Sequence, residues 1–196
     1  MNLNAPRGRN ADIALLVSLI ALMALTRVNH FAAIPDASWA VFFAGGLYLR
    51  RWTAWAFPML MLTAVVVDYI VITAQGMNFW QHYCISPGYW MLVPAYLSLW
   101  AGGMWLSKQT GKPAAVLAKA AAAVAVSVAA CQLFSQGGFY WMTDVVANKS
   151  IAGWAKNYND WLWPYMGTTF VYVAIGAALH AAIAQINAGL PRRVGA

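Results

Sequence analysis

Cys84 is the residue of this sequence best suited to metal or nucleophilic chemistry. It lies in the polar and aromatic segment 79–89, directly before a Pro87-Gly88 turn that leads into an apolar run. A thiol near a helix N-terminus has its thiolate favoured by the helix dipole, and a thiolate is both a soft metal ligand and a nucleophile. The alternatives are a buried, inert thiol and a disulfide with Cys131, the only other cysteine.

Asp68 is the only acidic residue well inside an apolar run long enough to cross a membrane. A carboxylate at that depth is costly, and it marks a functional site unless a partner neutralises it. The alternative is an ion pair with Arg27, at the end of the first apolar run. The two interpretations are compatible, because a paired carboxylate can still accept a hydrogen bond from a substrate.

Two histidines accompany these residues. His30 follows the first apolar run and His82 stands two residues before Cys84. Each alone is more typical of a hydrogen-bonded loop residue than of a metal ligand. Together with Asp68 and Cys84 they would make four ligands, the number that zinc prefers, but their spacing matches no zinc motif.

Long apolar runs must position these side chains. A bilayer core of about 30 Å needs roughly 20 apolar residues in a helix. Six segments fit this pattern with some variation in length, and we expect spans over 11–28, 37–49, 52–74, 89–106, 113–134 and 161–186. The sequence therefore predicts an all-α integral membrane protein, a single transmembrane domain over residues 1–196.

Composition supports a membrane protein. Of the 196 residues, 62% are hydrophobic and only 9% are charged, whereas soluble domains carry about 25% charged residues. The net charge of +7 does not indicate nucleic-acid binding, because the basic residues stand in short clusters between apolar runs rather than in one patch.

The basic clusters predict the orientation. Eight basic residues fall on one side of a six-span chain and three on the other, and the side rich in Lys and Arg faces the cytoplasm. We therefore expect both termini in the cytoplasm. The eight are Arg7, Arg9, Arg50, Arg51, Lys108, Lys112, Arg192 and Arg193.

The connections on the opposite, outer side are longer and richer in aromatic residues. They cover 29–36, 75–88 and 135–160, and we expect them to form a folded cap. The candidate residues all map to this side, as expected of a pocket for a large external ligand. No comparable set lines the middle of the spans, where an autonomous transporter places its substrate.

Six helices in about 200 residues with a capped outer pocket resemble the substrate-binding S components of energy-coupling-factor (ECF) vitamin transporters. The arrangement is most similar to the solitary cobalamin-specific S components of the BtuM type. The residues that carry the resemblance are Cys84 before the fourth helix, Tyr89 after the Pro-Gly turn, Asp68 on the third helix and His30 after the first.

The resemblance implies a specific ligand set. Cys84 would coordinate the cobalt of cobalamin as an axial ligand, and removal of the cyano group from cyanocobalamin would be an accessory activity. Residues that would bind the corrin amides or position the loop are His30, Asp68, His82, Tyr83 and Tyr89.

The resemblance also implies partners and a location. The protein would lie in the bacterial inner membrane and work with ECF transmembrane and ATPase subunits. The chain has no GxxxxGK[ST] phosphate loop, so it cannot itself be the ATPase. Two other functions stay open: a membrane thiol-redox enzyme using Cys84 and Cys131, and a structural subunit that binds no small molecule.

Overall fold

The computed structural model describes residues 8–28, 35–82 and 85–189, and within these ranges it contains helices and no strand. The prediction of an all-α protein is confirmed. Six α-helices and three short 3-10 helices follow one another: α1 (Arg9–Arg27), α2 (Ser38–Tyr48), η1 (Arg50–Trp52), α3 (Thr53–Ala74), η2 (Phe79–Gln81), η3 (Pro87–Met91), α4 (Leu92–Ser107), α5 (Pro113–Met142) and α6 (Ile151–Gly189).

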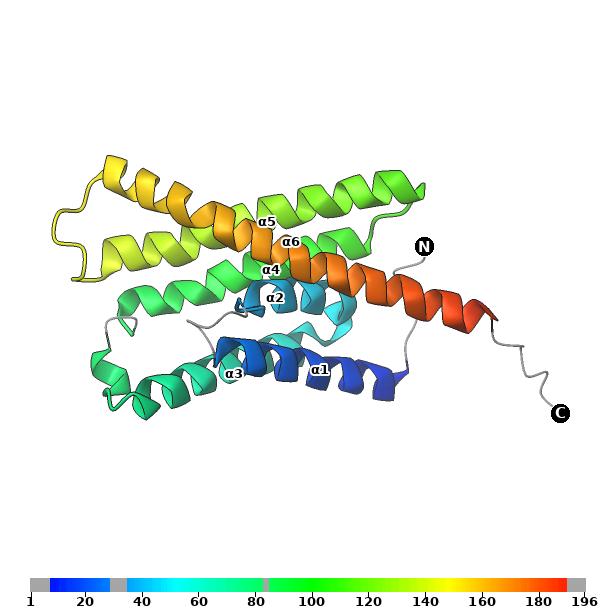
Figure 1. Ribbon diagram of the computed structural model, residues 1–196, viewed down its shortest axis with the longest axis horizontal. Coiled ribbons are helices and arrows are strands. Elements are labelled where there is room, and N and C mark those ends of the chain that lie inside the picture. The colour runs from blue at the N-terminus through cyan, green and yellow to red at the C-terminus, as the bar shows by residue number, and fades with distance from the viewer. Residues whose placement is uncertain (1–7, 29–34, 83–84, 190–196) are drawn as a thin grey trace.

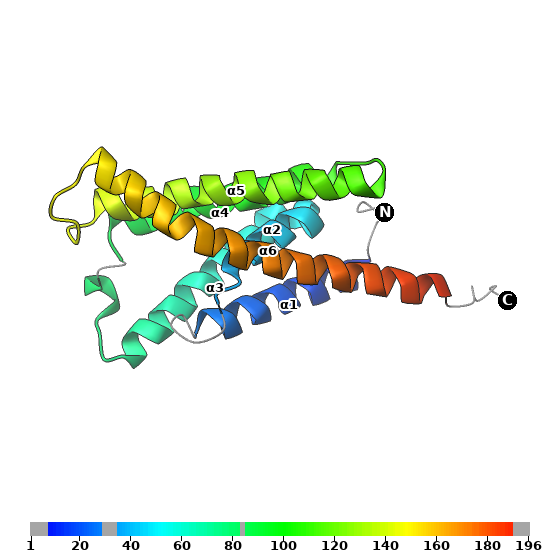
Figure 2. The ribbon, with the colours of Figure 1, turned by 45° about the horizontal axis from the view of Figure 1, so that its top comes forward.

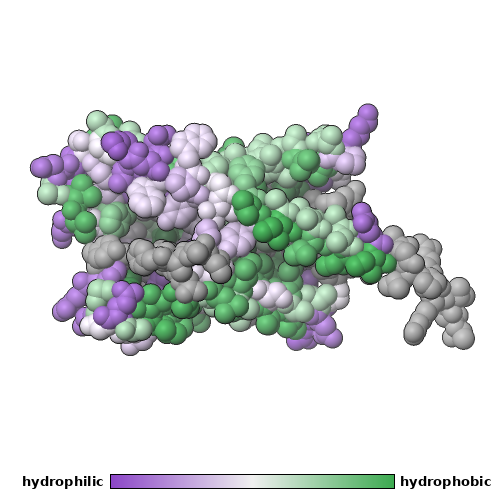
Figure 3. All heavy atoms as spheres, in the orientation of Figure 1, coloured by the Kyte–Doolittle hydropathy of each residue, from purple (hydrophilic) through white to green (hydrophobic). Residues whose placement is uncertain are grey.

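Four of these helical segments are long and apolar enough to cross a membrane, as expected of a multi-pass membrane protein. They are Arg9–Arg27, Arg50–Ala74, Pro113–Met142 and Ile151–Ile186. Large apolar side chains lie exposed along them, and Figure 3 shows this hydrophobic surface over the middle of the molecule, with hydrophilic residues gathered at its ends. α2 has only 11 residues, which is about 16 Å of helix and shorter than the hydrocarbon core.

The helices run roughly along the long axis of the molecule, with α4 near its centre (Figures 1 and 2). α4 packs on α2 and α5, α3 pairs with α1, and α6 lies across α5 and α2. Aromatic rings fill the core between α2 and α4, where Phe42 stacks on Tyr96 at 4.2 Å between ring centroids. Tyr96 and Trp100 are almost completely buried there.

Glycine allows α2 and α4 to approach backbone to backbone. A Cβ atom on Gly46 of α2 would overlap the main-chain carbonyl of Trp100, and one on Gly103 of α4 would overlap the carbonyl of Phe43. Small residues at a helix crossing are a common device for close packing in membranes. The short α2 is therefore held by contact with α4 rather than by its own length.

We predict that Gly46→Ala lowers the free energy of unfolding by about 1–3 kcal/mol, because the added methyl group meets main chain that cannot rotate away. The matched control is Gly176→Ala on α6, where a Cβ would meet nothing within 4 Å. That change should be neutral or stabilise by about 0.5–1 kcal/mol, the helix-propensity gain over glycine. Thermal unfolding in detergent measures both, and equal effects would contradict the close approach.

One end of the bundle carries Arg27, Asp68 and Tyr89, and it is named the Arg27 end. The first residue of α1 and the last of α6 lie at the opposite end (Figure 1). At that opposite end Arg50 donates to the hydroxyl of Ser107 at 3.3 Å, which joins the α2–α3 and α4–α5 connections. The basic clusters at Arg50-Arg51 and Lys108–Lys112 are thereby on one side of the bundle.

The prediction of a long loop over 135–160 is wrong. α5 continues to Met142 and α6 already begins at Ile151, so only residues 143–150 connect them. Polar bonds replace apolar packing along this extension: Gln136 donates to Asn157 at 2.8 Å, and the Tyr158 hydroxyl donates to the Ala129 carbonyl at 2.9 Å. Falling hydrophobicity marked the end of the apolar stretch, but the helices extend past it.

Candidate functional site

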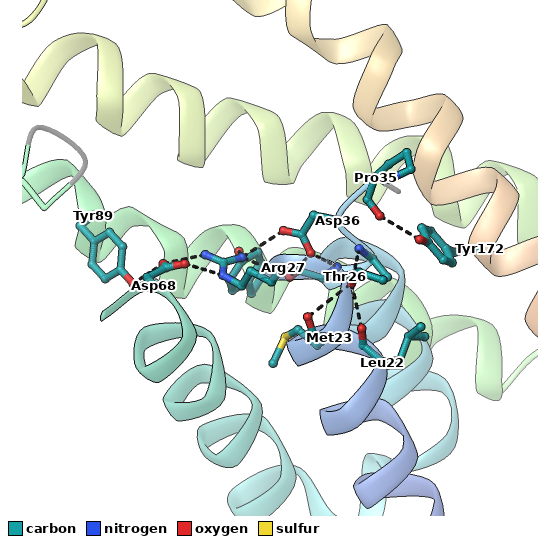
Figure 4. Close-up of polar contacts among 12 residues, drawn as sticks. Leu22, Met23, Thr26, Arg27, Pro35, Asp36, Asp68, Tyr89 and Tyr172 are labelled. Atoms are coloured by element: carbon teal, nitrogen blue, oxygen red, sulfur yellow. Dashed lines mark hydrogen bonds and ion pairs between the residues drawn. The ribbon is translucent and has the colours of Figure 1, made fainter. Parts of the chain in front are cut away.

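Arg27 and Asp68 form a bidentate ion pair at the Arg27 end (Figure 4). Arg27 Nε donates to Asp68 Oδ1 at 2.7 Å, and a terminal guanidinium nitrogen donates to Asp68 Oδ2 at 2.7 Å. Arg27 is the last residue of α1 and only 6% exposed, whereas Asp68 lies near the end of α3. The ion pair that the sequence suggested is confirmed.

The other terminal nitrogen of Arg27 contacts three further side chains. It lies 3.2 Å from Asp36 Oδ2, 3.1 Å from Ser38 Oγ and 3.2 Å from the Tyr96 hydroxyl. Asp36 in turn accepts from the Ser38 amide at 2.8 Å and from its hydroxyl at 2.6 Å, as a residue does at a helix start. One guanidinium therefore joins α1, α2, α3 and α4.

The segment leading into α2 is fixed by two more bonds. Thr26 Oγ1 accepts from the Ala37 amide at 3.1 Å and donates to the Leu22 carbonyl at 2.8 Å. The Tyr172 hydroxyl of α6 donates to the Pro35 carbonyl at 2.8 Å, as Figure 4 shows. Both ends of the connection 29–34 are therefore anchored near the ion pair, while the connection itself lies outside the described residues.

Tyr89 ties the segment before α4 to the same ion pair. Its hydroxyl donates to Asp68 Oδ2 at 2.8 Å. η3, which carries Tyr89, is also seated on α5, since Gly88 and Gly138 approach so closely that a Cβ on either would overlap the other helix. The backbone that follows Cys84 is thus held at two points, on α3 and on α5.

Of the site residues predicted from the sequence, the structure brings Asp68 and Tyr89 into contact. His82 ends η2, is partly exposed and makes contacts of its own. His30, Tyr83 and Cys84 lie outside the described residues. Within 8–28, 35–82 and 85–189, no three His, Cys, Asp or Glu side chains are grouped to hold a metal ion.

Sequence reasoning missed Tyr96 and Ser38 as members of this cluster. Tyr96 stands seven residues after Tyr89, a spacing that returns to the same helical face, and this was the available signal. Ser38 stands two residues after Asp36, the spacing at which an aspartate side chain accepts a hydrogen bond from the backbone amide.

Cys131 is the cysteine that lies within the described residues. Its thiol is free and completely buried, within the hydrophobic core formed with Val124, Val128 and Tyr96. A thiol in that position is a packing group rather than a reactive one.

The geometry indicates a positioning role for Asp68. Both of its oxygens accept short hydrogen bonds from Arg27, and one also accepts from Tyr89. A carboxylate whose two oxygens are both engaged by charged or hydroxyl donors orients the groups that are bonded to it. What the cluster can do is hold η3 and the two ends of the connection 29–34 close to the same ion pair. No protein-family model and no curated protein matches this sequence.

We predict that Tyr89→Phe lowers the free energy of unfolding by about 1–2 kcal/mol, because a hydrogen bond to a carboxylate is lost while the ring stays. The control is Tyr158→Phe, which removes a bond to the neutral Ala129 carbonyl and should cost about 1 kcal/mol or less. Denaturant or thermal unfolding in detergent compares them. A smaller loss for Tyr89→Phe than for Tyr158→Phe would contradict a charged anchor.

Proposed function

We propose that this chain is the membrane-embedded substrate-binding component that captures cobalamin from the outer side of a bacterial inner membrane. In this proposal it has six transmembrane segments and cytoplasmic termini, and the Arg27 end faces outward. ECF transmembrane and ATPase subunits supply the energy for uptake, because the chain carries no nucleotide-binding loop of its own.

The observation that carries the proposal is the hydrogen bond from Tyr89 to Asp68. It anchors η3, which follows Cys84 in the sequence, on the buried Arg27 pair, and Tyr172 anchors Pro35, which follows the connection that contains His30. The two segments that contain the candidate ligands Cys84 and His30 are therefore attached, at their described ends, at or next to the Arg27–Asp68 ion pair. Pre-positioned loops of this kind cost less entropy to order around a large ligand.

Cys84 is the proposed axial ligand of cobalt. A thiolate suits a borderline or soft metal, and the corrin ring supplies the four equatorial ligands, so one protein ligand is sufficient. On cyanocobalamin the thiolate would take an axial position as the cyano ligand leaves with its electron pair as cyanide, which changes no oxidation state. His30, His82 and Tyr83 would contact the corrin periphery.

The thiol-redox alternative has less support. It requires Cys84 and Cys131 to react together, yet Cys131 is 0% exposed within the hydrophobic core. A disulfide-exchanging thiol must be reached by its partner and favoured as thiolate, and neither condition suits this position.

The test is to purify the full-length chain in detergent from cells grown with hydroxocobalamin. We expect a red protein that holds about one corrinoid per chain, with an absorption spectrum shifted from that of the free vitamin. Protein from cells grown without the vitamin should acquire the same spectrum when hydroxocobalamin is added. A colourless product that binds no added hydroxocobalamin would overturn the proposal.

A further inference from the structure

Buried polar atoms without a hydrogen-bond partner are concentrated at one place in the described part of the chain. Three belong to α5 or to the residue that ends it, and one belongs to a tryptophan of α6 that lies beside Gly137. The fifth precedes η3, which is seated on α5 at Gly138. These atoms are Gln132 Nε2, Gln136 Oε1, Thr143 Oγ1, Trp154 Nε1 and Ser86 Oγ.

Elsewhere among the residues that the structure describes, the buried polar side chains are satisfied. Arg27 has the partners described above, and each buried hydroxyl away from this region has a hydrogen bond. The satisfied hydroxyls are those of Thr26, Ser38, Ser107, Ser127 and Thr169. The unmatched groups are therefore a local property of the last three turns of α5 and their surroundings.

Gln132 and Gln136 are the centre of this region. They stand four residues apart, which places them on one face of α5, and they are 2% and 8% exposed. Gln136 uses its amide nitrogen on Asn157 at 2.8 Å and keeps an unmatched oxygen, whereas Gln132 keeps an unmatched nitrogen. The pair thus offers one donor and one acceptor.

A buried amide atom without a partner destabilises a fold, so such atoms normally bind water or a ligand. The helix that carries these two is also rigidly placed. Tyr158 bonds to the Ala129 carbonyl of α5, and Tyr140 of α5 bonds to both the carbonyl and the amide of Ser150, the residue before α6. Side chains on a helix that is held in this way keep their positions when no ligand is bound.

We infer that Gln132 and Gln136 form a second recognition element, which binds primary carboxamide groups of the ligand. A carboxamide presents an acceptor oxygen and donor N–H groups, the complement of an unmatched Nε2 and an unmatched Oε1. This inference rests on the proposed function, since a corrin carries several peripheral carboxamides. It assigns their recognition to α5.

The test compares Gln132→Leu with Gln185→Leu in the full-length protein. Gln185 is exposed on α6, towards the end opposite Arg27. Hydroxocobalamin is titrated by absorbance, and the midpoint of thermal unfolding is measured without ligand. We expect Gln132→Leu to bind about 5- to 30-fold more weakly, as for the loss of one or two net hydrogen bonds, and to unfold at an equal or higher temperature when empty. Gln185→Leu should change neither measurement.

Weaker binding together with equal or higher stability of the empty protein is what a merely structural glutamine would not give. Unchanged affinity in Gln132→Leu would mean that only water meets these atoms, and it would overturn the inference while leaving the proposed function standing. Gln132→Met, which has nearly the volume of glutamine, replaces the leucine variant if that variant does not fold. If the wild-type chain binds no hydroxocobalamin, the proposed function and this inference fall together.

Discussion

Replacing Arg27 by leucine is expected to lower the free energy of unfolding by about 3–5 kcal/mol. The substitution keeps the apolar bulk at the end of α1 but removes the only described cation that contacts Asp36 and Asp68. The two carboxylates have side-chain exposures of 13% and 18%, so water replaces the lost partner poorly. Removing one member of a buried ion pair destabilises the fold by much more than the intact pair contributes to its stability, because an uncompensated charge is left buried.

The control for this prediction is Lys156→Leu. Lys156 lies 2.6 Å from Asp160, shorter than any Arg27 contact, but its side chain is 78% exposed. An exposed pair separated by one helical turn contributes about 0.3–0.5 kcal/mol. Unfolding in detergent with increasing SDS, followed by tryptophan fluorescence, measures both variants. Similar losses would show that the Arg27 network is not buried as described.

Arg27→Lys separates charge from geometry. A lysine keeps the positive charge but cannot donate in parallel to both oxygens of Asp68 while reaching Ser38 and Tyr96. We expect it to be more stable than the leucine variant and clearly less stable than the wild type. Full stability in the lysine variant would mean that the charge alone holds the four helices together.

The ion pair was one of the two interpretations of Asp68 that the sequence offered, because helix geometry locates residues well over a long apolar run. Asp68 lies sixteen residues from Trp52, about 24 Å along a helix, and this places it level with the end of α1. Intramembrane charges are rare and seek each other, so few pairings were available. The partners of the other terminal guanidinium nitrogen were harder to predict from the sequence. Tyrosine and serine side chains are stable in many environments, and Tyr96 looks like an ordinary aromatic residue in an apolar run.

The helices beyond the apolar runs could not be predicted in the same way. Hydropathy reports where a chain can lie in hydrocarbon, not where its helix stops. Gly137 and Gly138 lie within α5, and η3 packs so closely on Gly138 that a Cβ atom there would overlap Met91. The extension depends on contacts between distant residues, such as Gln136 with Asn157, that no local pattern specifies. The same region holds the unmatched glutamines: Gln132 falls near the end of the predicted span 113–134, and Gln136 falls in the loop predicted over 135–160.

Substituting Cys84 by alanine is expected to remove the shifted corrinoid spectrum and to weaken hydroxocobalamin binding by at least about 100-fold. Loss of groups that only support a metal ligand commonly costs 10- to 100-fold, and a direct ligand should cost more. The free energy of unfolding of the empty protein should change by less than about 1 kcal/mol, because Tyr89 and Gly88 hold the segment that follows. Absorbance titration and thermal unfolding of the same preparation provide the two measurements.

The matched variant is Cys131→Ser, which removes the other thiol. In the cobalamin hypothesis this change leaves the spectrum and the affinity as in the wild type, and it lowers stability modestly because a hydroxyl replaces a buried sulfur in the core. In the thiol-redox hypothesis both variants lose function equally, since exchange needs two sulfur atoms. The two hypotheses therefore differ in the behaviour of Cys131. A Cys131→Ser protein that folds but no longer binds hydroxocobalamin would contradict cobalt ligation by Cys84 alone. That result would support a reaction that requires both cysteines.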